Sequence, residues 1–262
     1  MLKELKELRK LCLRVSAAGR EGNLQSIFSS MEIIWTLYDR VMNWSCETAK
    51  SPDRDFFILS KGQSTMGLAA VLARKKFFST DELMTFGGSD SRFSMQADRT
   101  KFPEGGIENS AGSLGHGFPM AVGMALTHQI CGMKNRVYVL VGDGEMNEGT
   151  MWEAAILASS KRLNNLCVIV DDNDSIGRMI DMGSLSEKFR AFGFAVETCD
   201  GHDAEAIADK LRRLQQAESP SCLIAKTKRG FGSKTLMTDR SWFHRYPKGD
   251  ELEMLSAEVD AF

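Results

Sequence analysis

The sequence lacks several features that mark particular classes of protein. No apolar run approaches the roughly 18 residues that a membrane-spanning helix needs. The segment from Met1 to Leu8 mixes acidic and basic residues and has no apolar signal-peptide core. The net charge is only −2, and the longest basic cluster, at 226–229, is interpreted as a solvated surface after a strand. We therefore expect no membrane or nucleic-acid partner.

Cysteine pairs with metal-ligand spacing are also absent, because the six cysteines are widely scattered. Several lie in apolar runs, as Cys167 does, and are typical of small buried residues in a reducing cytoplasm. We find no internal repeat, low-complexity tract or proline-rich linker in the 262 residues, which suffice for one large domain with a sizeable core. The sequence thus predicts a single cytoplasmic domain over residues 1–262.

Apolar periodicity predicts the secondary structure. Residues from Leu2 to Val15 recur at three- and four-residue steps, which indicates an amphipathic helix ending near Gly19. The capping-box pairs Ser29–Glu32 and Ser79–Glu82 predict the starts of two more helices, the first running to about residue 42.

Short apolar and β-branched segments predict five strands, and helical segments lie between several of them. The strands are expected at 56–59, 137–141, 166–170, 194–198 and 222–227, with helices at about 152–162 and 204–216. Strand, helix and strand at this spacing imply right-handed crossovers. We therefore expect an α/β fold with a parallel central sheet and helices on both faces.

Two polar segments follow neighbouring predicted strands. Gly142-Asp143-Gly144 comes after one strand, and Asn173 comes after the next. Ligands of parallel sheets lie at the carboxyl ends of strands, and the flanking glycines let the backbone approach a ligand closely. A carboxylate and an amide oxygen suit Mg²⁺, which often bridges to phosphates, and the turn is expected to begin a helix whose N-terminus favours a diphosphate. The alternative, in which no ligand binds, is a tight turn beside an ordinary polar loop.

The same residues carry a resemblance to a known family. The stretch from Gly142 to Asn173 resembles the thiamine diphosphate motif of the transketolase family, and 142–154 is similar to the form found in split transketolases. The loop 111–117, Ala-Gly-Ser-Leu-Gly-His-Gly, is similar to the family's Thr-Gly-Ser-Leu-Gly-Gln-Gly. The segments 200–203, 226–227 and 242–247 occur in family order, so the resemblance covers nearly the whole chain.

The resemblance implies a thiamine diphosphate-binding fold, thiamine diphosphate and Mg²⁺ as cofactors, and a set of site residues. Asp143 and Asn173 would bind Mg²⁺ through their side chains, and Ser175 through its backbone carbonyl. Glu148 would reach across a subunit interface, or it is simply a carboxylate favoured at a helix start. The further residues implied in cofactor binding are Gly112, Ser113 and Leu114 at the rings, Gly142 and Gly144 at the diphosphate, and His244.

Histidines are scarce where the family carries several that handle the sugar substrate. The chain has four in total, and three family positions have become Asn23, Gln63 and Gln96. The loop glutamine has become His116, and only His244 stays in place, as a candidate contact for diphosphate and substrate. Amides keep hydrogen-bonding groups but do not titrate near neutral pH. We take these five residues as the catalytic candidates and expect an altered specificity.

The resemblance also implies a partner. The glutamate that activates the cofactor lies in a pyrimidine-binding domain, which we expect, with the C-terminal domain, on a separate chain in an α2β2 heterotetramer. The leading hypothesis is transfer of a two-carbon ketol or acyl unit from a ketone donor to an acceptor. The alternatives are an α-like subunit of a 2-oxo-acid decarboxylating enzyme and a non-catalytic cofactor-binding partner.

Overall fold

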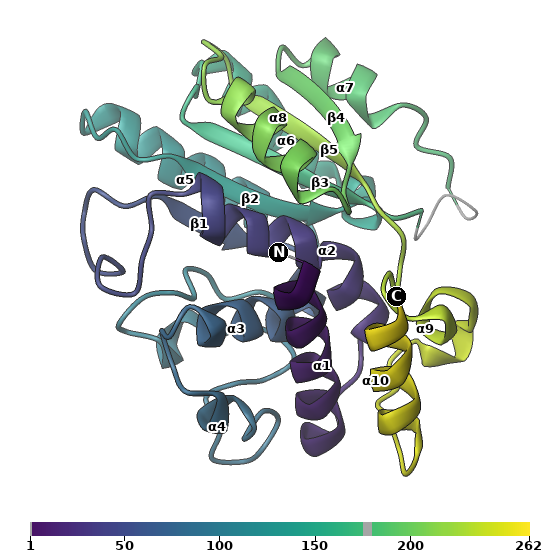
Figure 1. Cartoon of the computed structure of the whole chain (residues 1–262). Helices are drawn as coiled ribbons and strands as arrows, with labels where there is room; N and C mark the ends of the chain where they lie inside the picture. Colours follow the sequence, from purple (N-terminus) through teal and green to yellow (C-terminus); the bar gives the residue numbers. More distant parts are fainter. Residues whose placement is uncertain (1, 175–179) are drawn as a thin grey trace.

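The computed structural model describes residues 2–174 and 180–262, which form a parallel sheet covered by helices on both faces (Figure 1). The strands pair in the order β1-β2-β3-β5-β4, and every pairing is parallel. The five predicted strands are confirmed with shifts of at most two residues. They are β1 (Phe56–Leu59), β2 (Val137–Gly142), β3 (Leu166–Asp172), β4 (Ala195–Asp200) and β5 (Ser221–Lys226).

Alternating side chains of each strand enter two separate cores, because successive residues of a strand point to opposite faces of the sheet. Val139 of β2 lies in one core, with helices α5 (Gly117–Ile130), α6 (Gly149–Ser160) and α7 (Leu185–Ala191). Leu140, the next residue, lies in the other core. That core packs on α1 (Leu2–Gly19), α2 (Leu24–Thr36), α3 (Thr65–Arg74) and α8 (Ala204–Leu214). The expected α/β architecture is therefore present.

The expected start of the second helix was wrong. The helix α2 begins at Leu24, directly after Asn23, and continues into a π-helical turn at Leu37–Val41. Ser29 lies inside α2 and is fully buried, and its hydroxyl donates to the carboxylate of Asp171 at 2.7 Å instead of capping the helix. The second capping box is confirmed, because Ser79 accepts a hydrogen bond from the backbone N–H of Glu82 at 3.0 Å at the start of α4 (Thr80–Leu83).

Two further α-helices lie in the C-terminal part of the chain. α9 (Lys234–Thr238) precedes α10 (Glu251–Ala261), which packs beside α1 in Figure 1. Lys10 of α1 forms an ion pair with Asp260 of α10 at 2.8 Å. Among the described residues, no helix combines the length and apolar character needed to cross a membrane.

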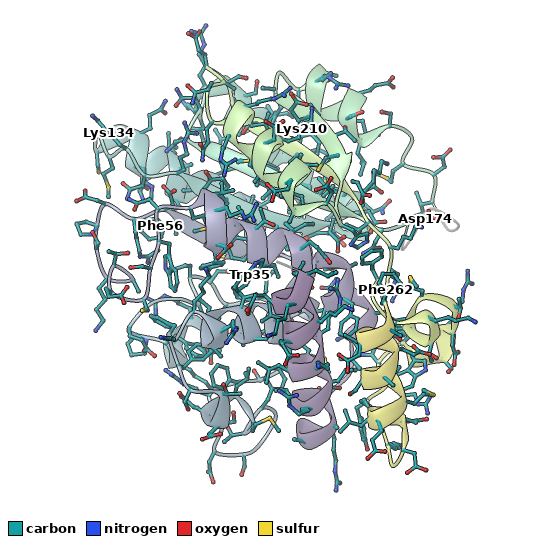
Figure 2. All side chains as sticks on the ribbon, viewed as in Figure 1. Trp35, Phe56, Lys134, Asp174, Lys210 and Phe262 are labelled. Carbon is teal, nitrogen blue, oxygen red and sulfur yellow. The ribbon has the colours of Figure 1, made fainter. Side chains whose placement is uncertain are left out.

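The two ends of the sheet are distinct. Figure 2 shows Lys134, which precedes β2, and Asp174, which follows β3, at opposite ends of the sheet. The loops after β1, β2, β3 and β5 therefore share the end marked by Asp174, because parallel strands have all their carboxyl ends on one side. This is the edge at which parallel sheets bind ligands.

Candidate functional site

A cavity of about 380 Å³ opens at this carboxyl edge. It is built by the loops after β1, β2 and β3, the start of α2, the segment between α4 and α5, and two segments that follow β5. Its lining combines backbone of the Gly142–Gly144 turn with polar and charged side chains. The lining residues are Asn23, Ser26, Lys61, Gln63, Gln96, Gly112, Leu114, Gly142, Asp143, Gly144, Glu145, Asn173, Arg229, Phe243 and His244.

Asp143 and Asn173 line this cavity together. The strands that precede them are neighbours, with Gly142 paired to Asp171. The pairing continues past the end of β2, because the backbone N–H of Asp143 donates to the carbonyl of Asp171 at 3.2 Å. The carboxylate of Asp143 accepts from the N–H of Gly144 at 2.8 Å. The two side chains thus face one space, as expected from their positions after adjacent strands.

The amide of Asn173 is held in one orientation. Its Nδ2 donates to the hydroxyl of Ser29 and to the carboxylate of Asp171, each at 3.2 Å. Its Oδ1 is buried and has no hydrogen-bond partner among the described residues. An unsatisfied buried carbonyl oxygen costs free energy unless a ligand completes it. The network therefore presents a bare oxygen at the cavity.

Asp171 is the centre of that network and is itself fully buried. Its carboxylate pairs with the ammonium of Lys61, which is also buried, and accepts hydrogen bonds from Ser29 and Thr227. A buried carboxylate is tolerated only when it is paired and hydrogen-bonded. These contacts hold Asp171 in place, and Asp171 in turn holds the side chain of Asn173 in its orientation. The sequence motifs predicted neither Asp171 nor Lys61 in this role.

The donor set at this point fits a hard divalent cation. Asp143 offers a carboxylate and Asn173 a bare amide oxygen, and Mg²⁺ prefers such ligands with waters and phosphate oxygens completing its octahedron. In the described ranges, no three His, Cys, Asp or Glu side chains gather in a way that could hold a metal ion. A site for a softer metal with several protein ligands is therefore not found there. Ser175, the third expected ligand, lies outside the described residues.

Glu145 also lines the cavity and holds neighbouring loops together through hydrogen bonds. It is almost fully buried, and its carboxylate accepts from the N–H of Gly115 at 2.9 Å, the N–H of Gly142 at 3.3 Å and the hydroxyl of Ser60. Burial raises the pKa of this carboxyl group above its usual value, and the hydrogen bonds partly offset that effect. Glu145 ties three loops together, a role that the sequence analysis missed.

Arg229 brings positive charge into the cavity, so the interpretation of 226–229 as a solvated surface is wrong for Arg229, whereas Lys226 and Lys228 are exposed as expected. The side chain is half-buried, and burial lowers the pKa of the guanidinium, which stays protonated in proteins. Its Nη2 lies 3.5 Å from the Oε1 of Gln25. A charge brought here by tertiary packing leaves no local sequence signal beyond the basic cluster itself.

Three of the lining residues are the neutral amides that the resemblance places at histidine positions of the family. Asn23 and Gln96 each have a buried side-chain atom, Nδ2 and Oε1 respectively, without a hydrogen-bond partner in the described part of the chain. Gln63 lines the same cavity. His244 also lines it, with its ring 4.4 Å from that of Phe243. These polar groups line the cavity together with Asp143 and Asn173.

Other expected residues lie apart from the cavity lining. Ser113, His116 and Glu148 are exposed, and the Nδ1 of His116 is 3.0 Å from the carbonyl of Leu114. Gly112 and Leu114 do line the cavity. The expected helix after the Gly142–Gly144 turn is delayed, because a 3₁₀ turn at Gly144–Asn147 precedes the start of α6.

Comparisons with known proteins identify related sequences and structures. The profile described as "Transketolase, thiamine diphosphate binding domain" matches residues 3–255. The chain is 36% identical over 256 residues to one subunit of the apulose-4-phosphate transketolase of Actinobacillus succinogenes, covering 96% of this chain and 92% of that protein. It is 34% identical to the 6-deoxy-6-sulfo-D-fructose transketolase subunit SqwG of a Clostridium species, covering 86% of this chain and 84% of that one.

A solved structure is also similar. Transketolase from Leishmania mexicana superposes with a TM-score of 0.88 at 26% identity over 99% of this chain. The present chain spans 41% of the length of that protein.

Proposed function

Because the chain belongs to the transketolase family of thiamine diphosphate binding domains, we propose that it is the N-terminal subunit of a two-subunit, thiamine-diphosphate-dependent transketolase-like enzyme. The enzyme transfers a short, two-carbon ketol or acyl unit from a ketone donor to an acceptor. One observation carries the assignment of the site: the carboxylate of Asp143 and the bare oxygen of Asn173 share one cavity.

The chain's own residues would hold the cofactor at the diphosphate. Asp143 and Asn173 would hold Mg²⁺, and Arg229 adds a positive charge in the same cavity. Leu114 gives an apolar contact for the rings. When bound, thiamine diphosphate supplies a carbon nucleophile and an electron sink.

An apolar surface next to the cavity supports a partner subunit. Leu114, Met120, Ile156 and Leu157 are each 40% or more exposed, and they lie on adjacent helices α5 and α6 and the loop before α5. Leu114 belongs both to this surface and to the cavity lining. We propose that the pyrimidine-binding subunit covers it, in an α2β2 assembly. Several similar relatives are named as single subunits of a transketolase, which supports a split enzyme.

The neutral amides would set the substrate. Asn23 and Gln96 offer an unpaired donor and an unpaired acceptor, which suit a neutral hydroxyl group that can both accept and donate. Neither side chain takes up a proton near neutral pH, so both serve recognition rather than general acid–base catalysis. We propose a specificity altered from that for ordinary sugar phosphates. The names of similar relatives that act on apulose 4-phosphate and a sulfofructose are consistent with such divergence.

Replacing Gln96 by methionine is expected to lower kcat/KM for a hydroxyketone donor about 10- to 100-fold, because a buried hydrogen-bond partner of the substrate is lost. The affinity for thiamine diphosphate should stay within about twofold, since Gln96 is not among the metal or diphosphate ligands. Steady-state kinetics and calorimetry on the same samples measure both. A lower affinity for thiamine diphosphate together with an unchanged kcat/KM would contradict this assignment.

Cofactor binding tests the proposed function directly. Calorimetry of the purified chain with thiamine diphosphate should show binding in the presence of Mg²⁺ and at least about a 100-fold loss of affinity with EDTA, because the metal bridges protein and phosphates. Equal binding in both buffers would reject the metal site. Once the pyrimidine-domain subunit is present, a ketose phosphate and pyruvate tested side by side separate ketol transfer from oxo-acid decarboxylation. Cofactor binding without turnover of either donor would favour a non-catalytic role.

A further inference from the structure

A buried cluster of charged and aromatic groups lies outside the cavity. The Nη2 of Arg9 in α1 donates to both carboxylate oxygens of Glu32 in α2, at 2.6 and 2.8 Å, and both side chains are less than 5% exposed. The ring of His202, from the turn after β4, lies with its Nδ1 3.3 Å from Glu32. The same ring stacks on Phe231 with centroids 3.5 Å apart and planes 9° from parallel. None of these residues lines the cavity.

The hydrogen bonds of His202 show which of its two ring nitrogens carries the proton. The backbone N–H of Lys228 donates to Nε2 at 2.8 Å. A backbone amide nitrogen can only donate, so Nε2 must accept and therefore carries no proton. The proton of the neutral ring then lies on Nδ1, where it faces the Glu32 carboxylate. His202 thus links a buried carboxylate to the backbone of the segment 227–231, which we term the Arg229 loop.

The Arg229 loop is fastened on each side of Arg229. Before it, the N–H of Lys228 is held by His202 at 2.8 Å. After it, the N–H of Gly230 donates to the carbonyl of Gln25 at 2.8 Å, and the carbonyl of Phe231 accepts from the Nε of Arg9 at 2.9 Å. The backbone position of the cavity-lining Arg229 therefore depends on these neighbours.

We propose that His202 is a positioning residue for cofactor binding, which acts by holding the Arg229 loop so that the Arg229 guanidinium faces the diphosphate. The inference rests on the proposed function, since it takes the diphosphate as the group that Arg229 meets. His202 itself does not touch the cofactor. Its ring takes the place of a water as the acceptor for the Lys228 N–H. Because the same ring contacts Glu32, which is paired with Arg9, the position of the Arg229 loop is tied to that ion pair.

Matched variants separate the three contacts of the His202 side chain, with Lys228, Glu32 and Phe231. His202→Gln supplies a longer amide whose oxygen can still accept from Lys228. His202→Asn keeps a polar group near Glu32 but is too short for Lys228, and His202→Phe keeps the stack on Phe231 without an acceptor. We expect Asn and Phe to weaken thiamine diphosphate binding about tenfold, and Gln to stay within about threefold of the natural chain.

A double-mutant cycle with Arg229→Met shows whether the effect passes through Arg229. The variant His202→Asn/Arg229→Met should bind thiamine diphosphate no more weakly than Arg229→Met alone, because the positioned group is already gone. Thiamine, which lacks phosphates, should bind the natural chain and His202→Asn equally. Calorimetry with Mg²⁺ measures all of these affinities, and thermal unfolding of each variant verifies that it is folded.

The possible failures are distinguishable. Unchanged affinity in folded His202→Asn and His202→Phe, or additive losses in the cycle, would overturn the role of His202 while leaving the cofactor assignment intact. Should His202→Phe fail to fold, the comparison of Asn with Gln decides the question. If neither the natural chain alone nor its complex with the pyrimidine-binding subunit bound thiamine diphosphate with Mg²⁺, the proposed function itself would be rejected.

Discussion

Replacing Asp143 by alanine is expected to weaken Mg²⁺-dependent binding of thiamine diphosphate by at least about 100-fold. Changes to groups that only support a metal ligand commonly cost 10- to 100-fold in metal affinity, so loss of a ligand that also carries the charge should cost more. The amide of Asn173 is neutral and cannot replace that charge. Calorimetry at fixed Mg²⁺ concentration measures the change.

Asp172 provides the matched control for Asp143. It is the last residue of the neighbouring strand β3 and carries the same charge, but it pairs with Lys226, whose side chain is 62% exposed, and does not line the cavity. Asp172→Ala should therefore leave cofactor affinity within about threefold, since surface ion pairs contribute little. Equal losses in the two variants would point to a general charge effect and would remove Asp143 from the metal site.

Replacing Lys61 by methionine is expected to lower the free energy of unfolding by about 3–5 kcal/mol, because it leaves the carboxylate of Asp171 buried without its counter-ion. The two side chains are 1% and 0% exposed. Hydrogen bonds from Ser29 and Thr227 remain in the variant but do not neutralise the charge. Urea unfolding followed by circular dichroism measures the difference.

Two further variants make the Lys61 result specific. Lys61→Met/Asp171→Asn removes both charges together and should recover much of the loss, since the large cost comes from the uncompensated ion. Lys210→Met breaks a pair with Glu197 at the surface, where the side chains are 25% and 30% exposed, and should cost less than about 1 kcal/mol. If Lys61→Met were no more destabilising than Lys210→Met, the buried pair would not be a major contributor to stability.

The sheet could be predicted from the sequence because its signal is local. Strands buried on both faces appear as short continuous apolar runs, and Val137 to Val141 is such a run. Asp143 and Asn173 could be placed together for a topological reason. Each follows one of two consecutive strands joined by a helix, and parallel strands end on the same side.

The groups that support the proposed metal ligands could not be predicted, because their contacts are distant in sequence. Ser29 has the local pattern of a helix cap, yet its hydroxyl is taken by a carboxylate 142 residues away. Lys61 has no motif of its own that announces a buried ion pair. Arg229 lies in a basic cluster whose simplest interpretation is solvation, and only the fold turns its side chain toward the cavity.

A third group consists of exposed residues that the family resemblance had marked as candidate site residues. Ser113, His116 and Glu148 are exposed outside the cavity lining, so their contacts within this chain do not fix a role for them. The resemblance implies that Ser113 lines the cofactor rings, and that Glu148 reaches a subunit interface unless it is simply a carboxylate at a helix start. His116 is one of the catalytic candidates, and all three assignments stay predictions.

The network around Asp171 has a consequence for recombination between relatives. Ser29 and Lys61 lie 142 and 110 residues before Asp171, and Thr227 lies 56 residues after it. A chimera with a crossover point between any two of them inherits the parts of one buried ionic cluster from two parents. Gene shuffling within this family should therefore tolerate breakpoints near either end of the chain far better than breakpoints in its middle.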